Sequence, residues 1–303
     1  MKQKLLALAL VLTLCAALTP AAAVSTPEPS GAPVCDHYDL VTFRNTSLGG
    51  RLTATDPEGE PVTFRLTTEP MKGTVTIEQD GAFVYTPNEG KKGKDYFGFK
   101  ATDASGSESD EETVIITIQK AKNAPAYADM SGRAEAYAAA RLAEAGVFTG
   151  PTVAGTALFQ PDEPVTREAF LSMCLAAAGE DVLQDVRATG FADDSAIPAW
   201  SRGFVSTGVL TGSVEGYATG NAVVFQPGQS VTRAEAAVML DRLFFPAGEV
   251  EAAALEGFDA VPAWAAQSVA KLTQASVYPK GADPDAPLTR AEAAVMLVNA
   301  MEG

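Results

Sequence analysis

Three arginines occupy the same place in a ten-residue string that the chain repeats. Residues 231–240 return almost unchanged as residues 288–297, and a looser copy spans residues 165–174. An arginine at the start of a helix adds positive charge to an end that is already partially positive, so helix stability does not explain it. A guanidinium beside free backbone amides binds a carboxylate through paired hydrogen bonds. The pattern therefore predicts sites for an anionic ligand at Arg167, Arg233 and Arg290.

The same string contains the signals that start a helix. In two copies a threonine stands three residues before a glutamate and ahead of an apolar run, at Thr232 and Glu235 and again at Thr289 and Glu292. This spacing is a capping box, in which both side chains accept hydrogen bonds from amides of the first turn. In the first copy the glutamate comes one position early, at Glu168, so we expect a weaker cap. The arginines are then left for a ligand, or for a salt bridge to a neighbouring repeat.

Other residue types recur around each string. Each copy has an aromatic residue closely followed by an aspartate, and two copies add a tryptophan before the first expected helix. Self-similarity at this period indicates stacked copies of one small unit, so we expect a three-repeat array. The recurring aspartates and tryptophans are Asp129, Asp193, Asp259, Trp200 and Trp264.

This set of motifs resembles the S-layer homology domain of bacterial surface proteins, over about residues 125–303. The resemblance implies an all-α part of three helix–loop–helix repeats, arranged as a pseudo-trimer with grooves between neighbours. It also implies a ligand, a secondary cell-wall polysaccharide whose ketal-linked pyruvate presents a carboxylate. By the family's motif the arginines hold that carboxylate, Trp200 and Trp264 pack against sugar rings, and Asp129, Asp193 and Asp259 bind sugar hydroxyls or fix a loop.

Structural alternatives remain open at this stage, and the copies differ. The tryptophans fit a half-buried core and the aspartates fit helix caps. In the first copy Ala134 stands where a tryptophan is expected. In the third copy the glycine-rich loop is short. We therefore expect Arg233 to be the most competent of the three arginines, and the third groove the least competent.

The N-terminus has the features of a secretory signal. Lys2 and Lys4 precede an apolar stretch that ends in small residues, which predicts a signal peptide over residues 1–23 and a flexible linker over 24–33. The chain has 22 Lys and Arg against 38 Asp and Glu, a formal net charge of −16. This balance disfavours nucleic acid as a partner, because phosphate binding needs a basic surface.

Residues 34–120 have a different texture. Short runs of alternating apolar residues, such as 83–85 and 114–118, are separated by turn signals, which predicts an antiparallel β-sandwich. Several phrases, among them residues 50–59 and 81–87, resemble the Ig-like or cadherin-like modules of bacterial surface proteins. The acids Asp56, Glu58, Glu60 and Asp103 could ligate calcium, but turn residues and solvated acids explain them more simply.

We therefore expect a multidomain chain with a β-sandwich at 34–120 and S-layer homology repeats at 125–180, 185–246 and 250–303. The expected function is non-catalytic anchoring to the bacterial cell wall, with the sandwich displayed at the surface. The expected partners are the polysaccharide and other surface proteins, with no membrane after signal cleavage. No cofactor, metal set or catalytic residues are expected. An adhesin that acts through the sandwich, or a glycan-remodelling enzyme of the envelope, remains the alternative.

Overall fold

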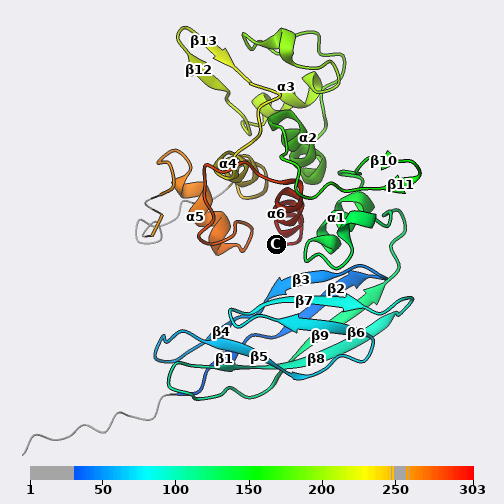
Figure 1. Ribbon diagram of the computed structural model, residues 1–303. Helices are drawn as coiled ribbons and strands as arrows, with labels where there is room; N and C mark the ends of the chain where they lie inside the picture. The colour runs from blue at the N-terminus through cyan, green and yellow to red at the C-terminus, as the bar shows by residue number, and fades with distance from the viewer. Residues whose placement is uncertain (1–30, 247, 249–256, 259) are drawn as a thin grey trace, which may run out of the picture.

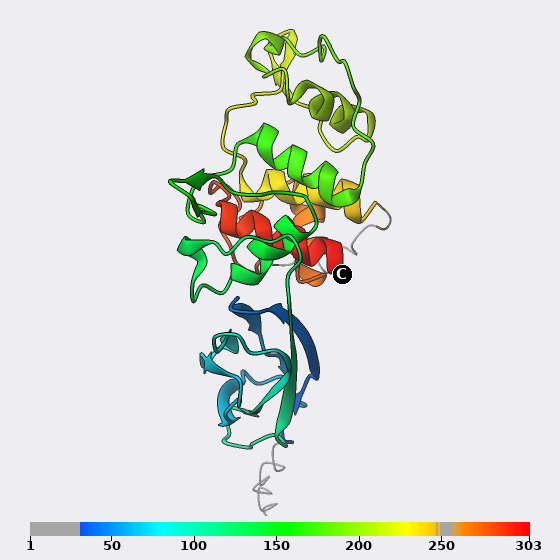
Figure 2. The same cartoon turned by 90° about the vertical axis from the view of Figure 1, so that its right-hand side faces the viewer.

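The structure is a computed structural model that describes residues 31–246, 248, 257–258 and 260–303. The expected signal peptide, most of the expected linker and Asp259 lie outside the described residues. A β-rich part is followed by a mainly helical part, and the two are stacked end to end (Figures 1 and 2).

The β-rich part consists of two packed sheets and a short strand pair, consistent with an Ig-like sandwich. One sheet has the order β2-β9-β8-β5, the second has the order β3-β7-β6, and β1 pairs with β4. The strands are β1 (Val34–Cys35), β2 (Tyr38–Phe43), β3 (Leu48–Arg51), β4 (Ala54–Thr55), β5 (Thr63–Thr68), β6 (Gly73–Ile77), β7 (Ala82–Pro87), β8 (Gly93–Thr102) and β9 (Glu112–Gln119).

Alternation along these strands produces the core. Tyr85, Phe97, Phe99 and Ile116 are fully buried, because successive side chains of a strand point to opposite faces. The expectation of a purely antiparallel sandwich is wrong at one pair, since β2 runs parallel to β9. The parallel pairing brings the first long strand beside the last one and makes β2 an edge of that sheet.

The C-terminal part contains helices in three successive segments, each with two α-helices: α1 and α2 in the first, α3 and α4 in the second, and α5 and α6 in the third. The α-helices are α1 (Ala136–Glu144), α2 (Arg167–Ala178), α3 (Arg202–Leu210), α4 (Arg233–Phe244), α5 (Ala266–Gln274) and α6 (Arg290–Glu302), with short 3-10 turns η1 (Ala128–Met130) and η2 (Asp194–Ala196). The expectation of an all-α part needs correction, because two hairpins lie between helices: β10 (Thr152–Val153) with β11 (Thr156–Ala157), and β12 (Tyr217–Thr219) with β13 (Ala222–Val224). Within the described residues, no helix has the length and apolar character needed to cross a membrane.

The helices pack in a cyclic order. The helices α2, α4 and α6, which begin with the repeated string, contact one another in the centre (Figure 1). Each remaining α-helix packs on the central helix of the preceding segment: α3 on α2, α5 on α4, and α1 on α6. Because α1 closes the cycle against the last helix, each segment depends on its neighbours for its core.

Backbone hydrogen bonds at the centre follow the same cycle. The residue before the threonine of each string donates to the equivalent residue of another copy: Val165 to Leu288 (2.9 Å), Leu288 to Val231 (2.9 Å) and Val231 to Val165 (3.0 Å). All three residues are buried. This closed triangle fixes the three helix starts relative to one another.

The helical part docks on the sandwich through α1. The amide of Gly49 donates to the carbonyl of Ala134 (2.9 Å), and the amide of Tyr137 donates to the carbonyl of Ser47 (3.0 Å). The Tyr137 ring also packs against Phe43, with 5.5 Å between ring centroids. These contacts hold the sandwich in a defined orientation relative to the helices.

Candidate functional site

The amides at the three helix starts are not free. In each string the amide of the arginine donates to a carbonyl of the next segment in the cycle: Arg167 to Gln229 (2.8 Å), Arg233 to Ala286 (3.1 Å) and Arg290 to Glu163 (2.9 Å). The following amide of each helix is used in the same way. The predicted cradle of free amides is therefore wrong, and any anion at these positions must be held by side chains.

Arg167 is buried and faces the second segment. Its Nη1 donates to the hydroxyl of Tyr217 at 2.8 Å and lies 3.6 Å from the carboxylate of Glu235. The guanidinium also lies over the Tyr217 ring, 4.6 Å from its centroid. The Tyr217 hydroxyl in turn donates to Glu235. Burial and the hydrogen bond to Glu235 raise the pKa of Tyr217 well above its usual value, so it stays a neutral donor.

Arg233 is the most completely paired of the three arginines. It donates to Glu292 from Nε at 3.1 Å and from Nη2 at 2.6 Å, and to the carbonyl of Asp283 at 3.1 Å. Burial favours a raised pKa for Glu292, but hydrogen bonds from the Thr289 amide and from Arg233 outweigh it and hold the pKa below its usual value. The structure thus does not support Arg233 as the most available site, because a ligand must displace Glu292.

Arg290 is the exception in this cycle. Its Nη1 donates to the carbonyl of Phe159 (2.6 Å) and to the side chain of Gln160 (3.0 Å). Among the described residues no carboxylate forms an ion pair with it, and burial lowers its pKa. Arg167 and Arg233 pair with the third helical residue of the next string, Glu235 and Glu292. The equivalent residue for Arg290 is Ala169, because the first copy has its glutamate one position early.

The described aspartates fix loops. The carboxylate of Asp129 accepts the amides of Phe159 (2.8 Å) and Gln160 (2.7 Å). Asp193 does the same for Phe225 and Gln226, both at 2.8 Å. Each of the two glutamines has a positive φ, a backbone angle that residues other than glycine rarely adopt. Of the two roles expected for these aspartates, the geometry accounts for loop fixing without a ligand.

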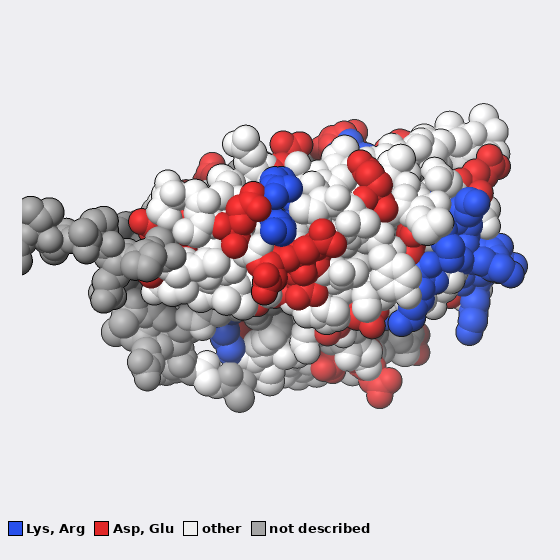
Figure 3. Space-filling model, turned by 90° about the horizontal axis from the view of Figure 1, so that it is seen from below, with Lys and Arg blue, Asp and Glu red and all other residues white. Residues whose placement is uncertain are grey.

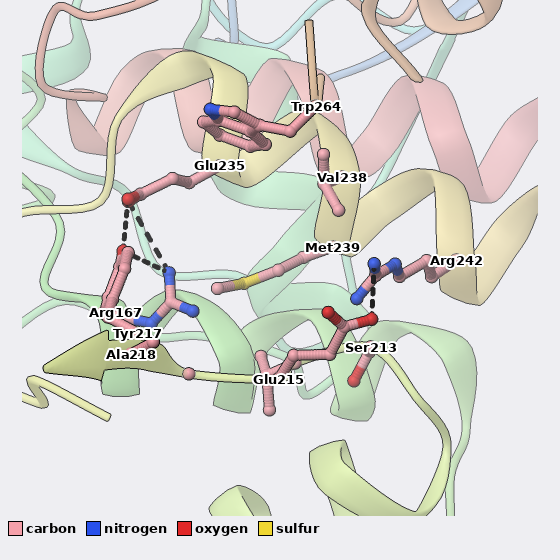
Figure 4. Close-up of a pocket in the computed structure, with 12 residues that line it drawn as sticks. Arg167, Ser213, Glu215, Tyr217, Ala218, Glu235, Val238, Met239, Arg242 and Trp264 are labelled. Carbon is pink, nitrogen blue, oxygen red and sulfur yellow. Dashed lines mark hydrogen bonds and ion pairs between the residues drawn. The ribbon is translucent and has the colours of Figure 1, made fainter. Parts of the chain in front are cut away.

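The two tryptophans line different cavities. Trp264 is 60% exposed and lines a cavity of about 440 Å³ together with Arg167, Tyr217 and Glu235 (Figure 4). Trp200 is 56% exposed, contacts the Phe204 ring, and lines a separate cavity of about 470 Å³ over residues 182–186. The structure therefore brings Trp264 and Arg167 together and leaves Trp200 apart.

One face of α4 forms a wall of the Trp264 cavity. Glu235, Val238, Met239 and Arg242 follow one another at spacings that place them on one side of a helix. Arg242 is the cation that the sequence reasoning missed. It donates to the carbonyl of Gly212 at 3.0 Å and pairs with Glu215 at 2.8 Å. The helical spacing from Glu235 was the signal that could have identified it.

The cavity places the apolar ring of Trp264 near Arg242, a cation whose ion pair with Glu215 is weak. Glu215 is 74% exposed, and an ion pair with such a partner contributes about 0–1 kcal/mol. A carboxylate entering the cavity can therefore replace Glu215 on Arg242 at low cost. Trp264 lies across the same opening from Glu215 (Figure 4), where its indole can pack against the C–H face of a sugar. The arrangement suits an acidic sugar.

The acids of the sandwich turns have local partners. Asp56 accepts the amides of Glu58 (3.1 Å) and Glu60 (2.7 Å), and Asp103 accepts the amide of Ser107 (2.8 Å). These bonds are typical of turn residues. No group of three or more His, Cys, Asp or Glu side chains suited to a metal ion occurs in the described part of the chain.

Comparison with protein families identifies the class of this chain. The family model of the bacterial cadherin-like domain matches residues 30–120, and that of the S-layer homology domain matches residues 126–171 and 190–237. The chain therefore carries a bacterial cadherin-like domain followed by S-layer homology domains, which are cell-wall-anchoring domains of surface proteins. The matched ranges include Arg167 and Arg233. The third copy of the string lies beyond them.

Solved structures resemble only part of the chain. The human protocadherin-24 EC1-2 structure is 13% identical, with 32% of this chain and 49% of that one covered at a TM-score of 0.25. The SrpA adhesin from Streptococcus sanguinis is 14% identical over 32% of this chain and 64% of that one, at 0.25. The endo-fucoidan hydrolase MfFcnA4 of glycoside hydrolase family 107 is 17% identical over 37% and 17%, at 0.26. This chain thus spans less than two thirds of each. A comparison with curated proteins finds no match.

Proposed function

We propose that this chain is a non-catalytic anchor that holds its sandwich at the bacterial surface by binding an acidic secondary cell-wall polysaccharide. Residues 1–23 direct export, and residues 125–180, 185–246 and 250–303 act as three S-layer homology repeats in a pseudo-trimer. The pyruvyl ketals of the polysaccharide supply the carboxylates. The observation that carries the proposal is the cavity in which the exposed indole of Trp264 and the guanidinium of Arg242 share one opening. The carboxylate partner of Arg242 is exposed and is easily displaced.

In this proposal the residues of the cavity have distinct roles. The sugar ring packs on Trp264 and its carboxylate takes the place of Glu215 on Arg242. Arg167 is buried and already bonded to Tyr217, so it shapes the wall and adds positive potential from behind. Arg290 is a second position for a carboxylate: among the described residues no acid forms an ion pair with it, and Glu163 and Asp129 act on its charge only from a distance.

Pelleting with purified cell-wall sacculi tests the proposal. We expect Trp264→Ala to weaken binding by up to about tenfold, since the contacts of one aromatic ring are worth about 0.5–1.5 kcal/mol. Arg242→Gln is expected to weaken binding to pyruvylated sacculi, and to have no effect on sacculi stripped of pyruvyl groups.

Trp200→Ala is the matched control. Trp200 is about equally exposed, but among the described residues the only charged one lining its cavity is Asp185, which repels an acidic sugar. Its removal should leave pelleting unchanged. Equal losses for the two tryptophan variants, or undiminished binding by Trp264→Ala, would show that the Trp264 cavity is not the binding site.

A further inference from the structure

A cluster of lysines lies at one end of the sandwich, in a chain with a formal net charge of −16. Seen from below, Lys and Arg side chains gather at one edge of the molecule, away from most of the acids of this face (Figure 3). We call this cluster the basic end. It comes from the turn before β6, the turn that leads into β8, the start of β8 and the residue after β9, and it comprises Lys72, Lys91, Lys92, Lys94 and Lys120.

Hydrogen bonds hold the two turns of the basic end together. The Lys72 ammonium donates to the carbonyls of Lys92 (3.2 Å) and Lys94 (2.7 Å). The buried carboxylate of Asp95 accepts the amides of Met71 (3.0 Å) and Lys72 (2.8 Å). The lysines are therefore presented by a fixed frame, so that binding a ligand does not require ordering a loop.

Glycines give the second turn its shape. Gly90 and Gly93, on either side of Lys91 and Lys92, have φ values of +70° and +76°. Residues other than glycine rarely adopt this backbone conformation, so the backbone of the turn determines where the two lysines lie. Lys120 joins them because Gly93, at the start of β8, pairs with Ile118 of β9, two residues before Lys120.

The charges of the basic end are not neutralised within the fold. Lys91, Lys92, Lys94 and Lys120 are exposed, and no ion pair joins any of the five lysines to an acid in the described part of the chain. Like charges held close together repel one another. A bound polyanion removes this repulsion and releases the counterions that otherwise surround the lysines.

The basic end continues into a cavity at the junction with the helices. The amide of Arg44 donates to Gln119, next to Lys120, at 2.8 Å. Arg44 lines a cavity of about 280 Å³ with Thr46 and Tyr127. Its Nε is buried without a hydrogen-bond partner among the described residues. An anionic group of the same ligand would satisfy it.

We propose that the basic end binds an anionic glycan, a sugar polymer with carboxylate or phosphate groups along its length, and that Arg44 takes one of these groups. An aromatic side chain favours a glycan over polyanions that have no ring to pack against it, such as polyphosphate. Tyr96 is 48% exposed and lies two residues after Lys94 on β8, so both point to the same face. Its ring can pack against sugar C–H groups beside the lysines. This site is separate from the Trp264 cavity.

Binding of fluorescent polygalacturonate to the full chain from residue 24 tests the proposal at low salt, with neutral dextran as the reference. An exposed ion pair is worth about two- to fivefold in affinity. The variant Lys91→Gln, Lys92→Gln, Lys94→Gln should therefore bind about tenfold or more weakly and with a shallower dependence on salt. Arg44→Gln should lose about two- to fivefold. If Arg44→Gln binds polygalacturonate as tightly as the parent chain, Arg44 is not part of the site.

The matched control removes the same charge elsewhere, as Arg51→Gln, Arg65→Gln, Arg187→Gln. It should bind within about twofold of the parent chain. An equal loss in this control would reduce the effect to net charge and overturn the proposal. Stronger binding of a single-stranded oligonucleotide or of phosphatidylglycerol vesicles at the same lysines would also overturn it. The loss measured here is that of the lysine variant on polygalacturonate, whereas wall anchoring is measured by the pelleting of Trp264→Ala with sacculi, so a failure of one proposal is distinct from a failure of the other.

Discussion

Exchanging residues 168 and 169 gives the first string the order of the other two without changing the composition of the chain. In the variant Glu168→Ala, Ala169→Glu, the new glutamate occupies the position from which Glu235 and Glu292 reach Arg167 and Arg233. Ala169 is half-buried, as those glutamates are, so the position tolerates a carboxylate at its edge. We expect the variant to be more stable, because it completes the cycle of ion pairs.

The expected gain has two parts. Thr166 caps α2 by accepting the Ala169 amide, but the return bond of a capping box is missing, whereas α4 and α6 have both bonds. Completing the box contributes about 0.5–1 kcal/mol. A partly buried pair with Arg290 adds about 1 kcal/mol. A total of about 2 kcal/mol corresponds to about 4–8 °C in Tm for a part of this size.

Thermal unfolding followed by circular dichroism measures this gain. The variant Glu168→Ala alone is the reference, because it removes the original carboxylate without adding the new one. Adding Arg290→Gln to both chains closes a double-mutant cycle that isolates the pair. If the gain is the same with glutamine at position 290, the new glutamate does not pair with Arg290. That result would refute the inference that the missing glutamate of the first string leaves Arg290 without a carboxylate partner.

Further predictions concern single carboxylates. Asp193→Ala should lower the free energy of unfolding in urea by about 2–3 kcal/mol, because two loop amides lose their acceptor. Burial raises the pKa of Glu168, with a hydrogen bond to Ser201 opposing it, so the charged form destabilises the fold. Glu168→Gln should therefore be more stable than the parent chain at pH 7, and the difference should vanish as the pH falls below 4.5, the usual value. Glu292→Gln should show the opposite sign: its pKa is lowered, so the parent chain is the more stable one at pH 7 and loses that advantage as the pH falls below 4.5.

Local features of this fold could be predicted from the sequence because their partners lie within a few residues. The capping boxes at Thr232 and Thr289 are confirmed, and the incomplete cap at Thr166 is confirmed as well. The strands expected at 83–85 and 114–118 fall within β7 and β9. In each case the spacing alone determines which groups can meet.

The partners of the arginines could not be predicted in this way. Arg233 meets Glu292 and Arg290 meets Phe159 only because the segments close into a cycle, and no local spacing encodes that closure. The net charge was misleading for a similar reason. A total of −16 says nothing of position, and the pairing of β8 with β9 brings Lys94 and Lys120 to the same end of the sandwich.

The cyclic pairing also changes what a departure from the repeated string means. If all three copies carried the glutamate at the third helical position, every arginine would face the glutamate of another copy and would already have an acidic partner. The altered copy is the first, yet the arginine that it leaves without an ion pair, among the described residues, is Arg290 of the third. The similarity of a copy to the consensus therefore does not predict its own availability. It predicts how far the arginine of its neighbour is already neutralised.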